Sequence, residues 1–170
     1  MKQTINWFQS NLLSLNSNKT HFLQFLTKKH NEMKIQIMAS NSIITNINST
    51  KFLGLTIDCT LSWGEHILGL SSKLNKACYA IRAIKPYMSP SVLRTVYFSY
   101  FHSVMSYGII FWGNSHFNNN IFKIQKRIIR ILANNGKREP CRDLYKQLQI
   151  LTHLSQYMFS LLVFVDKHRN

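Results

Sequence analysis

The run KFLGLTID, from Lys51 to Asp58, constrains the fold most, because the character of the chain changes there. Its residues are mostly strand formers, and Gly54 in their midst predicts a bulge or a place where another backbone comes close. Short strand-like runs precede it, and helical patterns follow it. The plain interpretation of the run itself is an ordinary core strand. The chain as a whole is predicted to be α+β, with a rigid corner at this point.

The part before the corner is predicted to be one helix followed by a small sheet. Apolar residues recur at helical spacing over residues 2–15, and the polar residues 16–19 end that pattern. Because the following connections are short, neighbouring strands are expected to form antiparallel hairpins. The predicted strands span residues 21–26, 34–38, 42–47 and 51–57, with polar turns at 28–32 and 39–41.

The part after the corner is predicted to be a helical bundle. A long helical pattern begins at Trp63 and is ended by Pro86. A second helix is expected after Ser89, with Pro90 in its first turn. It is apolar nearly all round, through Val92, Tyr100 and Met105, so we expect it to be the central helix, buried on more than one face. Gly136 is expected to end the third helix and Pro140 to open another, with Leu144, Leu148 and Leu151 inward. A last apolar helix is predicted over residues 153–166, with Tyr157, Leu161, Leu162 and Val165.

The third helix of this bundle, about residues 117–133, carries a stripe of positive charge. Four cations, Lys123, Lys126, Arg127 and Arg130, have the spacing i, i+3, i+4 and i+7 and no acid among them. The other side of the helix carries apolar residues, namely Ile121, Ile124, Ile128, Ile131 and Leu132. Each like-charge pair costs a few tenths of a kcal/mol. A solvated face is the usual interpretation of such a stripe, but solubility is served better by mixed charge. We favour a surface that follows a row of phosphates.

The charge balance also points to a polyanionic partner. The 170 residues include 21 Lys and Arg against six Asp and Glu, which gives a formal net charge of +15. Nucleic acid is the expected neutralising partner. Anionic membrane is the alternative, weakened because the cations, Lys73 and Lys76 among them, are spread along the chain. No membrane span is expected, since the most apolar segment, residues 92–113, contains Arg94, His102 and several serines.

The residues of a catalytic site are missing. Transfer of a phosphoryl group by two metal ions needs closely placed carboxylates, and no two of the six acids are adjacent. No glycine-rich phosphate loop, GxSxG or HExxH motif occurs. Cys59, Cys78 and Cys141 are widely spaced, so we expect reduced, mostly buried thiols in an intracellular protein, cytoplasmic or nuclear. The chain alone is therefore predicted to be neither an enzyme nor a binder of a cofactor, and no small-molecule substrate is expected.

Six segments in order resemble the C-terminal part of the reverse transcriptases of non-LTR retrotransposons, of the jockey-like kind found in insects. The resemblance covers almost the whole chain, and the order and gaps of the segments are what make it specific. The segments are LNSNKTHFLQF (15–25), KFLGLTID (51–58), LSWGEHI (61–67), the Lys-rich helix that follows, YGIIFWG (107–113) and IFKIQKRIIRIL (121–132).

The resemblance implies an end of the polymerase palm, residues 1–58, followed by a thumb-like helical domain, residues 59–170. Lys19 matches the lysine of motif D, near the incoming nucleotide. The KFLGLTID run resembles motif E, the primer-grip hairpin, so Phe52, Leu53 and Gly54 would touch the primer's 3′ end. Lys51, close to the glycine in the same run, suits contact with a phosphate-bearing strand. The thumb would hold the template and primer duplex by its backbone, with Lys73, Lys76 and the basic stripe in contact.

The chain departs from the family in one decisive respect. The catalytic motif of the palm, an aromatic residue followed by Ala-Asp-Asp, is absent, as are the fingers and the endonuclease. RNA-directed DNA polymerase activity, with Mg²⁺, is therefore implied for the parent element only. We expect a non-catalytic fragment that binds RNA, DNA or an RNA/DNA hybrid. The alternatives are a stand-alone basic nucleic-acid-binding protein and a helical module for an acidic protein partner.

Overall fold

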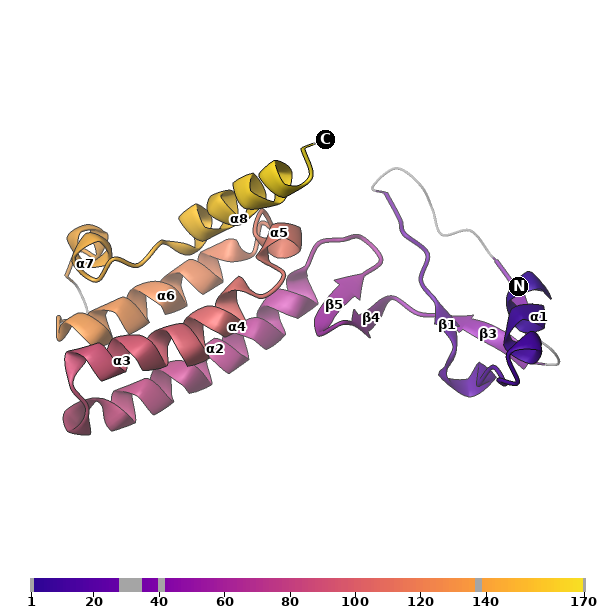
Figure 1. Ribbon diagram of the computed structural model, residues 1–170, viewed down its shortest axis with the longest axis horizontal. Helices are drawn as coiled ribbons and strands as arrows, with labels where there is room; N and C mark the ends of the chain where they lie inside the picture. The colour runs from indigo at the N-terminus through magenta and orange to yellow at the C-terminus, as the bar shows by residue number, and fades with distance from the viewer. Residues whose placement is uncertain (1, 28–34, 40–41, 137–138, 170) are drawn as a thin grey trace. The chain divides into compact units, whose positions relative to one another are not determined.

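The protein is α+β, as the sequence predicts, and its chain divides into two units. The computed structural model describes residues 2–27, 35–39, 42–136 and 139–169. Unit 1 is Met1–Ser62 and contains the strands, and unit 2 is Trp63–Asn170 and is helical (Figure 1). The division falls four residues beyond the expected boundary at residue 58, because a loop of residues 59–62 still belongs to unit 1.

Unit 1 begins with α1 (Lys2–Ser10) and a 3₁₀ turn, η1 (Ser17–Lys19). The predicted helix over residues 2–15 is therefore too long. It ends early because Leu12 has a φ of 57°, outside the helical region, and because the Asn11 side chain donates a hydrogen bond of 2.8 Å to the Trp7 carbonyl. Leu12 is 97% exposed, so the apolar spacing that suggested a longer helix corresponds to no buried face.

The larger sheet of unit 1 has three strands in the order β1-β3-β2, and the parallel pairing of β1 with β3 was not expected. The strands are β1 (His21–Phe22), β2 (Ile37–Ala39) and β3 (Ser42–Asn46). The β2–β3 pair is antiparallel, as predicted, whereas β1 and β3 are parallel. A parallel pair needs a long connection, and residues 23–41 supply one between β1 and β3. The predicted turns at 28–32 and 39–41, and the predicted start of a strand at 34, lie wholly or partly outside the described residues.

The KFLGLTID run is two strands with a tight turn, so the interpretation as one core strand with a bulge is wrong. The strands β4 (Ser49–Phe52) and β5 (Leu55–Asp58) pair antiparallel, with Phe52 opposite Leu55. Leu53 and Gly54 form the turn with φ values of 46° and 81°. Positive φ at both central residues is the pattern of a type I′ hairpin turn, whose twist matches that of the strands.

Asp58 fixes the loop that follows the hairpin. It is 9% exposed, and its Oδ1 accepts hydrogen bonds from the Thr60 N–H (3.1 Å), the Thr60 hydroxyl (2.6 Å) and the Ser62 N–H (3.0 Å). A carboxylate that accepts two backbone N–H groups closes an Asx-type turn. The lone acid at the end of KFLGLTID thus has a structural role.

The turn makes a testable prediction about stability. Replacing Leu53 with Asn should stabilise the hairpin by about 0.5–1 kcal/mol, because Asn adopts positive φ more readily than Leu. Replacing Gly54 with Val should destabilise it by about 1–2 kcal/mol. Hydrogen exchange of the amides in β4 and β5 measures both changes. If the amides were equally protected in the wild type and the two variants, the positive φ angles assigned to Leu53 and Gly54 would be contradicted.

Unit 2 is built on three long helical segments that lie side by side in Figure 1. The first is α2 (Gly64–Ile84), followed by η2 (Lys85–Tyr87), which contains Pro86. The second comprises α3 (Pro90–Val96), a π-helical segment η3 (Tyr97–His102) and α4 (Ser103–Ser106). The third is α6 (Asn118–Ala133), which packs against α2. The short α5 (Ile109–Trp112) and α7 (Arg142–Gln147) and the terminal α8 (His153–Lys167) complete the unit.

The predicted ends of these helices agree with the structure in most places. Ser89 is the N-cap of α3, its hydroxyl accepts a hydrogen bond from the Val92 N–H, and Pro90 occupies the first turn. α6 ends at Ala133, as expected for a helix over about residues 117–133, but the residue that terminates it is Asn134 and not Gly136. Asn134 takes the left-handed conformation with a φ of 61°, which Asn tolerates better than most residues.

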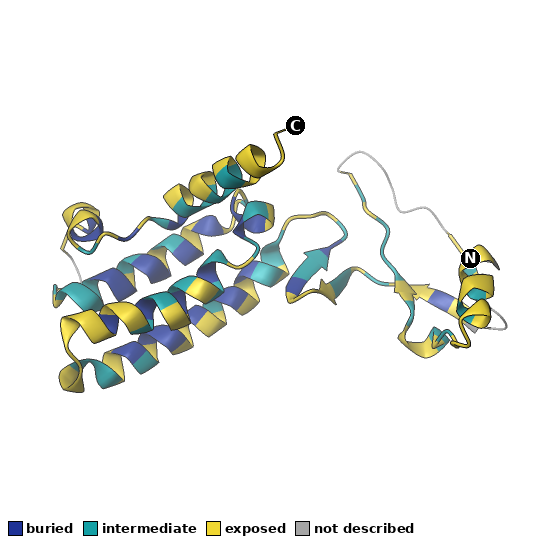
Figure 2. Cartoon of the chain, viewed as in Figure 1, coloured by how far each residue is buried: buried dark blue, intermediate teal, exposed yellow. Residues whose placement is uncertain are grey.

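The core of unit 2 lies between the three long segments (Figure 2). Leu74, Ile81, Tyr97, Phe101 and Ile128 are fully buried there. The second segment is not buried on more than one face, because Val92 and Tyr100 are 44% and 46% exposed. The apolar faces predicted for the last two helices are also only partly buried. Leu151, Leu162 and Val165 are exposed, while Leu144 is buried.

A buried amide ties α6 to the segment before α8. Gln125 is fully buried, and its Nε2 donates to the Leu151 carbonyl (2.8 Å) and, more weakly, to the Tyr97 hydroxyl (3.4 Å). Its Oε1 accepts a hydrogen bond of 2.8 Å from the His153 N–H. One side chain thereby satisfies polar groups of two other segments.

His153 is buried beside this amide in its neutral form. It is 1% exposed, its ring centroid lies 5.5 Å from that of Phe122, and neither ring nitrogen has a hydrogen-bond partner among the described residues. Burial lowers the pKa of His153 from 6.5 to about 4. The folded chain therefore excludes a proton that the unfolded chain would bind at mildly acidic pH.

The free energy of unfolding should fall as the pH decreases from 6.5 towards 4. The unfolded chain takes up the His153 proton in this window and the folded chain does not, so stability present above pH 6.5 is lost, by up to about 3 kcal/mol at about 1.4 kcal/mol per pH unit. Burial also lowers the pKa of His66 and His102, which adds in the same direction. Urea unfolding from pH 7.5 to 4.5 should show a weaker pH dependence for His153→Leu than for the wild type. If the free energy of unfolding of His153→Leu and of the wild type depended on pH to the same extent, the lowered pKa of His153 would be contradicted.

Candidate nucleic-acid interface

The basic stripe of α6 faces a groove that α2 shares. The groove has a volume of about 550 Å³, and Lys123, Lys126, Arg127 and Arg130 all line it. Arg82, near the end of α2, and Lys85, which follows it, line the same groove, as do Ile131, Asn134 and Asn135. We call this feature the basic groove. Among the residues that the structure describes, it brings together six positively charged side chains, and none of the described residues that line it is acidic.

The spacing of the four cations along α6 explains why they all face the basic groove. Residues at i, i+3, i+4 and i+7 share one face of a helix. The opposite face supplies the core of unit 2, where Ile121, Ile124, Ile128 and Ile129 are buried. Ile131 and Leu132, predicted to be on the inward side, are only half-buried. The core therefore fixes the rotation of α6, and with it the direction of the stripe.

Neutral acceptors hold three of the six cations. The Lys85 Nζ donates to the Asn134 Oδ1 (2.8 Å), the Arg127 Nη1 donates to the Asn75 Oδ1 (2.8 Å), and the Arg130 Nε donates to the Glu139 backbone carbonyl (2.9 Å). These hydrogen bonds orient the side chains without neutralising their charges. Among the residues that the structure describes, none of the six forms an ion pair.

Lys126 is oriented in a similar way. Its Nζ lies 4.1 Å from the centroid of the Phe122 ring, one turn earlier on α6. A cation over an aromatic face gains about 0.5–1 kcal/mol at an exposed site and keeps its full charge. Four of the six cations of the groove thus keep their positive charge while a neutral partner orients the side chain.

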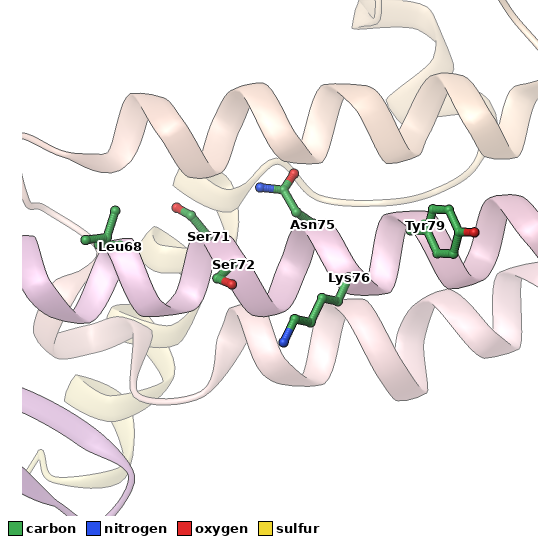
Figure 3. Close-up of a pocket in the computed structure, with 6 residues that line it drawn as sticks. All are labelled: Leu68, Ser71, Ser72, Asn75, Lys76 and Tyr79. Atoms are coloured by element: carbon green, nitrogen blue, oxygen red, sulfur yellow. The ribbon is translucent and has the colours of Figure 1, made fainter.

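Two shallower hollows extend the basic groove along α2. One is lined by Asn75, Cys78, Tyr79, Arg82 and Arg127. The next is lined by Leu68, Ser71, Ser72, Asn75, Lys76 and Tyr79, which all come from α2; Figure 3 shows Lys76 on one side of that helix and Asn75 on the other. Shared residues connect the three hollows. From Leu68 to Lys85 the helix rises about 26 Å, at about 1.5 Å per residue.

Cys78 lies beneath this surface as an inert thiol. Burial raises the pKa of Cys78 to about 11, although the positive charges of Arg127 and Arg82 act in the opposite direction. The thiolate, which is the nucleophilic form, is therefore disfavoured. All three cysteines are free, as expected; Cys78 and Cys141 are buried and Cys59 is half-buried.

The structure divides the predicted site residues between the two units. Lys76 and the four cations of α6 line the connected hollows of unit 2. Lys73 is exposed on α2 but lines none of the three; its charge, after burial, is the second cause that lowers the pKa of His66. Lys19, Lys51, Phe52, Leu53 and Gly54 belong to unit 1, where all are exposed.

Sequence reasoning missed Arg82 and Lys85 as site residues. Both lie on the polar side of the α2 pattern, three residues apart, so they share a helix face. That spacing is the signal that could have identified them. The sequence does not show that α2 packs beside α6, which places Arg82 and Lys85 in the same groove as the stripe.

In the described part of the chain, neither a membrane span nor a metal centre is found. No helix of the described part of the chain has the length and apolar character needed to cross a bilayer. Among the described residues, no group of three or more His, Cys, Asp or Glu side chains is placed to hold a metal ion.

Comparisons with known proteins add no relative. No protein-family model, no curated protein and no solved structure matches the chain significantly.

Proposed function

We propose that this chain binds nucleic acid through the phosphates of its backbone and carries out no chemistry of its own. The observation that supports the proposal is the basic groove, where four of the six cations are oriented by neutral partners and none of the six is paired with an acid among the described residues. Such a cluster is repulsive by itself, and a row of phosphates would compensate it.

The resemblance in sequence supports a more specific form of the proposal. The chain would be a fragment of a non-LTR retrotransposon reverse transcriptase, with residues 1–58 from the palm and residues 59–170 from the thumb. The exposed hairpin turn at Leu53 and Gly54 and the exposed Lys19 would then be contacts additional to the basic groove. Any Mg²⁺ would belong to the palm of the parent enzyme, whose Ala-Asp-Asp motif this chain lacks.

The salt dependence of binding tests the proposal. Each neutralised phosphate contributes about −0.9 to the slope of log K against log[salt], so about three contacts in the basic groove give roughly −2.7, and contacts elsewhere on the chain would make the slope steeper. Fluorescence anisotropy of a labelled RNA/DNA hybrid at several salt concentrations measures this slope. An acidic peptide of equal charge serves as the comparison: tighter binding of the peptide than of the hybrid would favour an acidic protein partner instead. No binding of the hybrid at about 50 mM salt would overturn the proposal.

A further inference from the structure

The basic groove concentrates more charge than a nucleic-acid backbone can match locally. Its volume of about 550 Å³ is that of a sphere about 10 Å across, and it contains six positively charged groups. Successive phosphates of one strand are separated by a sugar and advance about 3.4 Å along a duplex axis, so about three of them fit in that length. Three phosphodiesters carry three negative charges, which leaves about half of the positive charge uncompensated.

The cations converge from two walls. Arg82 and Lys85 belong to one wall, and the stripe of α6 forms the other. Arg side chains bind phosphate oxygens in a planar, bidentate geometry, and Lys acts as a point charge. At the end of the groove, the Oδ1 of Asn134 accepts a hydrogen bond from Lys85, so its amide nitrogen remains as a donor. Glu139 is not among the lining residues, and its Oε2 accepts a hydrogen bond from Asn135.

We propose that the basic groove binds a chain of at least three directly linked phosphates, either free inorganic polyphosphate or the triphosphate of a nucleotide. Linked phosphates share a bridging oxygen, so they place more negative charge in the same length than phosphodiesters do. The inference rests on the same groove as the proposed function, but it assigns a different ligand to that groove. Bound polyphosphate would occupy the same cations as the nucleic acid, so the two ligands would compete.

Calorimetric titration of the full-length chain with phosphate, pyrophosphate, tripolyphosphate and ATP, at a constant ionic strength of about 0.15 M, tests the inference. Tripolyphosphate should bind at least about tenfold more tightly than pyrophosphate, because each added charged hydrogen bond changes the affinity by about that factor. ATP binding more tightly than tripolyphosphate identifies the nucleotide as the source. The reverse order identifies inorganic polyphosphate.

A pair of double variants locates the site. Arg82→Gln with Lys85→Gln should weaken tripolyphosphate binding at least about tenfold. Arg142→Gln with Lys146→Gln makes the same change in net charge at one exposed Arg and one exposed Lys outside the groove, and should change binding less than about twofold. Equal losses in the two double variants, or tripolyphosphate binding no tighter than pyrophosphate, would overturn the inference. Binding of the RNA/DNA hybrid is measured on the same samples. If the hybrid binds while the tripolyphosphate result fails, only the inference is overturned; if the hybrid does not bind, the proposed function fails.

Discussion

Replacing Lys123, Lys126, Arg127 and Arg130 with glutamine should weaken binding of an RNA/DNA hybrid by up to about 500-fold at about 0.1 M salt. If the contacts to about three phosphates in the groove are lost, the slope of log K against log[salt] becomes shallower by about 2.7, which over one decade of salt corresponds to a loss of about 500-fold. The fold should survive because these side chains lie on the groove face of α6, opposite the buried isoleucines. Removal of their mutual repulsion should slightly raise the melting temperature.

A charge-matched variant distinguishes the basic groove from the overall positive charge. Glutamine at Arg142, Lys146, Lys167 and Arg169 removes four charges from exposed side chains that line none of the hollows described along α2 and α6. This variant should keep most of the wild-type slope. If both quadruple variants lose affinity and slope equally, binding depends on net charge, and the groove has no special role.

Replacing Gln125 with Met should lower the free energy of unfolding of unit 2 by about 2–4 kcal/mol. Met has a similar volume, so packing is preserved while the hydrogen bonds to the Leu151 carbonyl and from the His153 N–H are lost. Each buried polar group left without a partner costs about 1–3 kcal/mol. Urea unfolding followed by circular dichroism at pH 7.5, where the imidazole of His153 stays neutral in both states, measures the change.

The matched control for this change is Gln147→Met. Gln147 is exposed at the end of α7, so its replacement should change the stability by less than about 0.5 kcal/mol. A loss below about 1 kcal/mol for Gln125→Met would mean that the buried amide contributes little. The tie between α6 and the segment before α8 would then depend on apolar packing alone.

The sequence predicts those features of the site that lie on one element. The stripe of α6 follows from spacing within a single helix, and the core confirms its direction by burying the opposite isoleucines. The basic groove also needs Arg82 and Lys85, and their approach to the stripe depends on tertiary packing between α2 and α6, which no local pattern encodes. Gln125 shows the same limit, because a polar residue on a buried face becomes interpretable only when its partners are known.

The fold shows a similar division between local and tertiary information. The fold class and most helix ends follow from periodicity, capping and proline, as at Ser89 and Pro90. The parallel pairing of β1 with β3 joins residues far apart in sequence, so short-range spacing favoured the wrong arrangement. In KFLGLTID the apolar run suggested one strand, whereas positive φ at Leu53 and Gly54 makes it a hairpin.

Lysine footprinting tests most directly whether the basic groove is the nucleic-acid contact surface. The full chain, alone and saturated with an RNA/DNA hybrid, is acetylated briefly, and the modification of each lysine is quantified by mass spectrometry. Lys85, Lys123 and Lys126, which line the groove, should become protected, while Lys146 and Lys167 should react as before. Unchanged reactivity of the three groove lysines, together with protection of Lys146 and Lys167, would contradict the account.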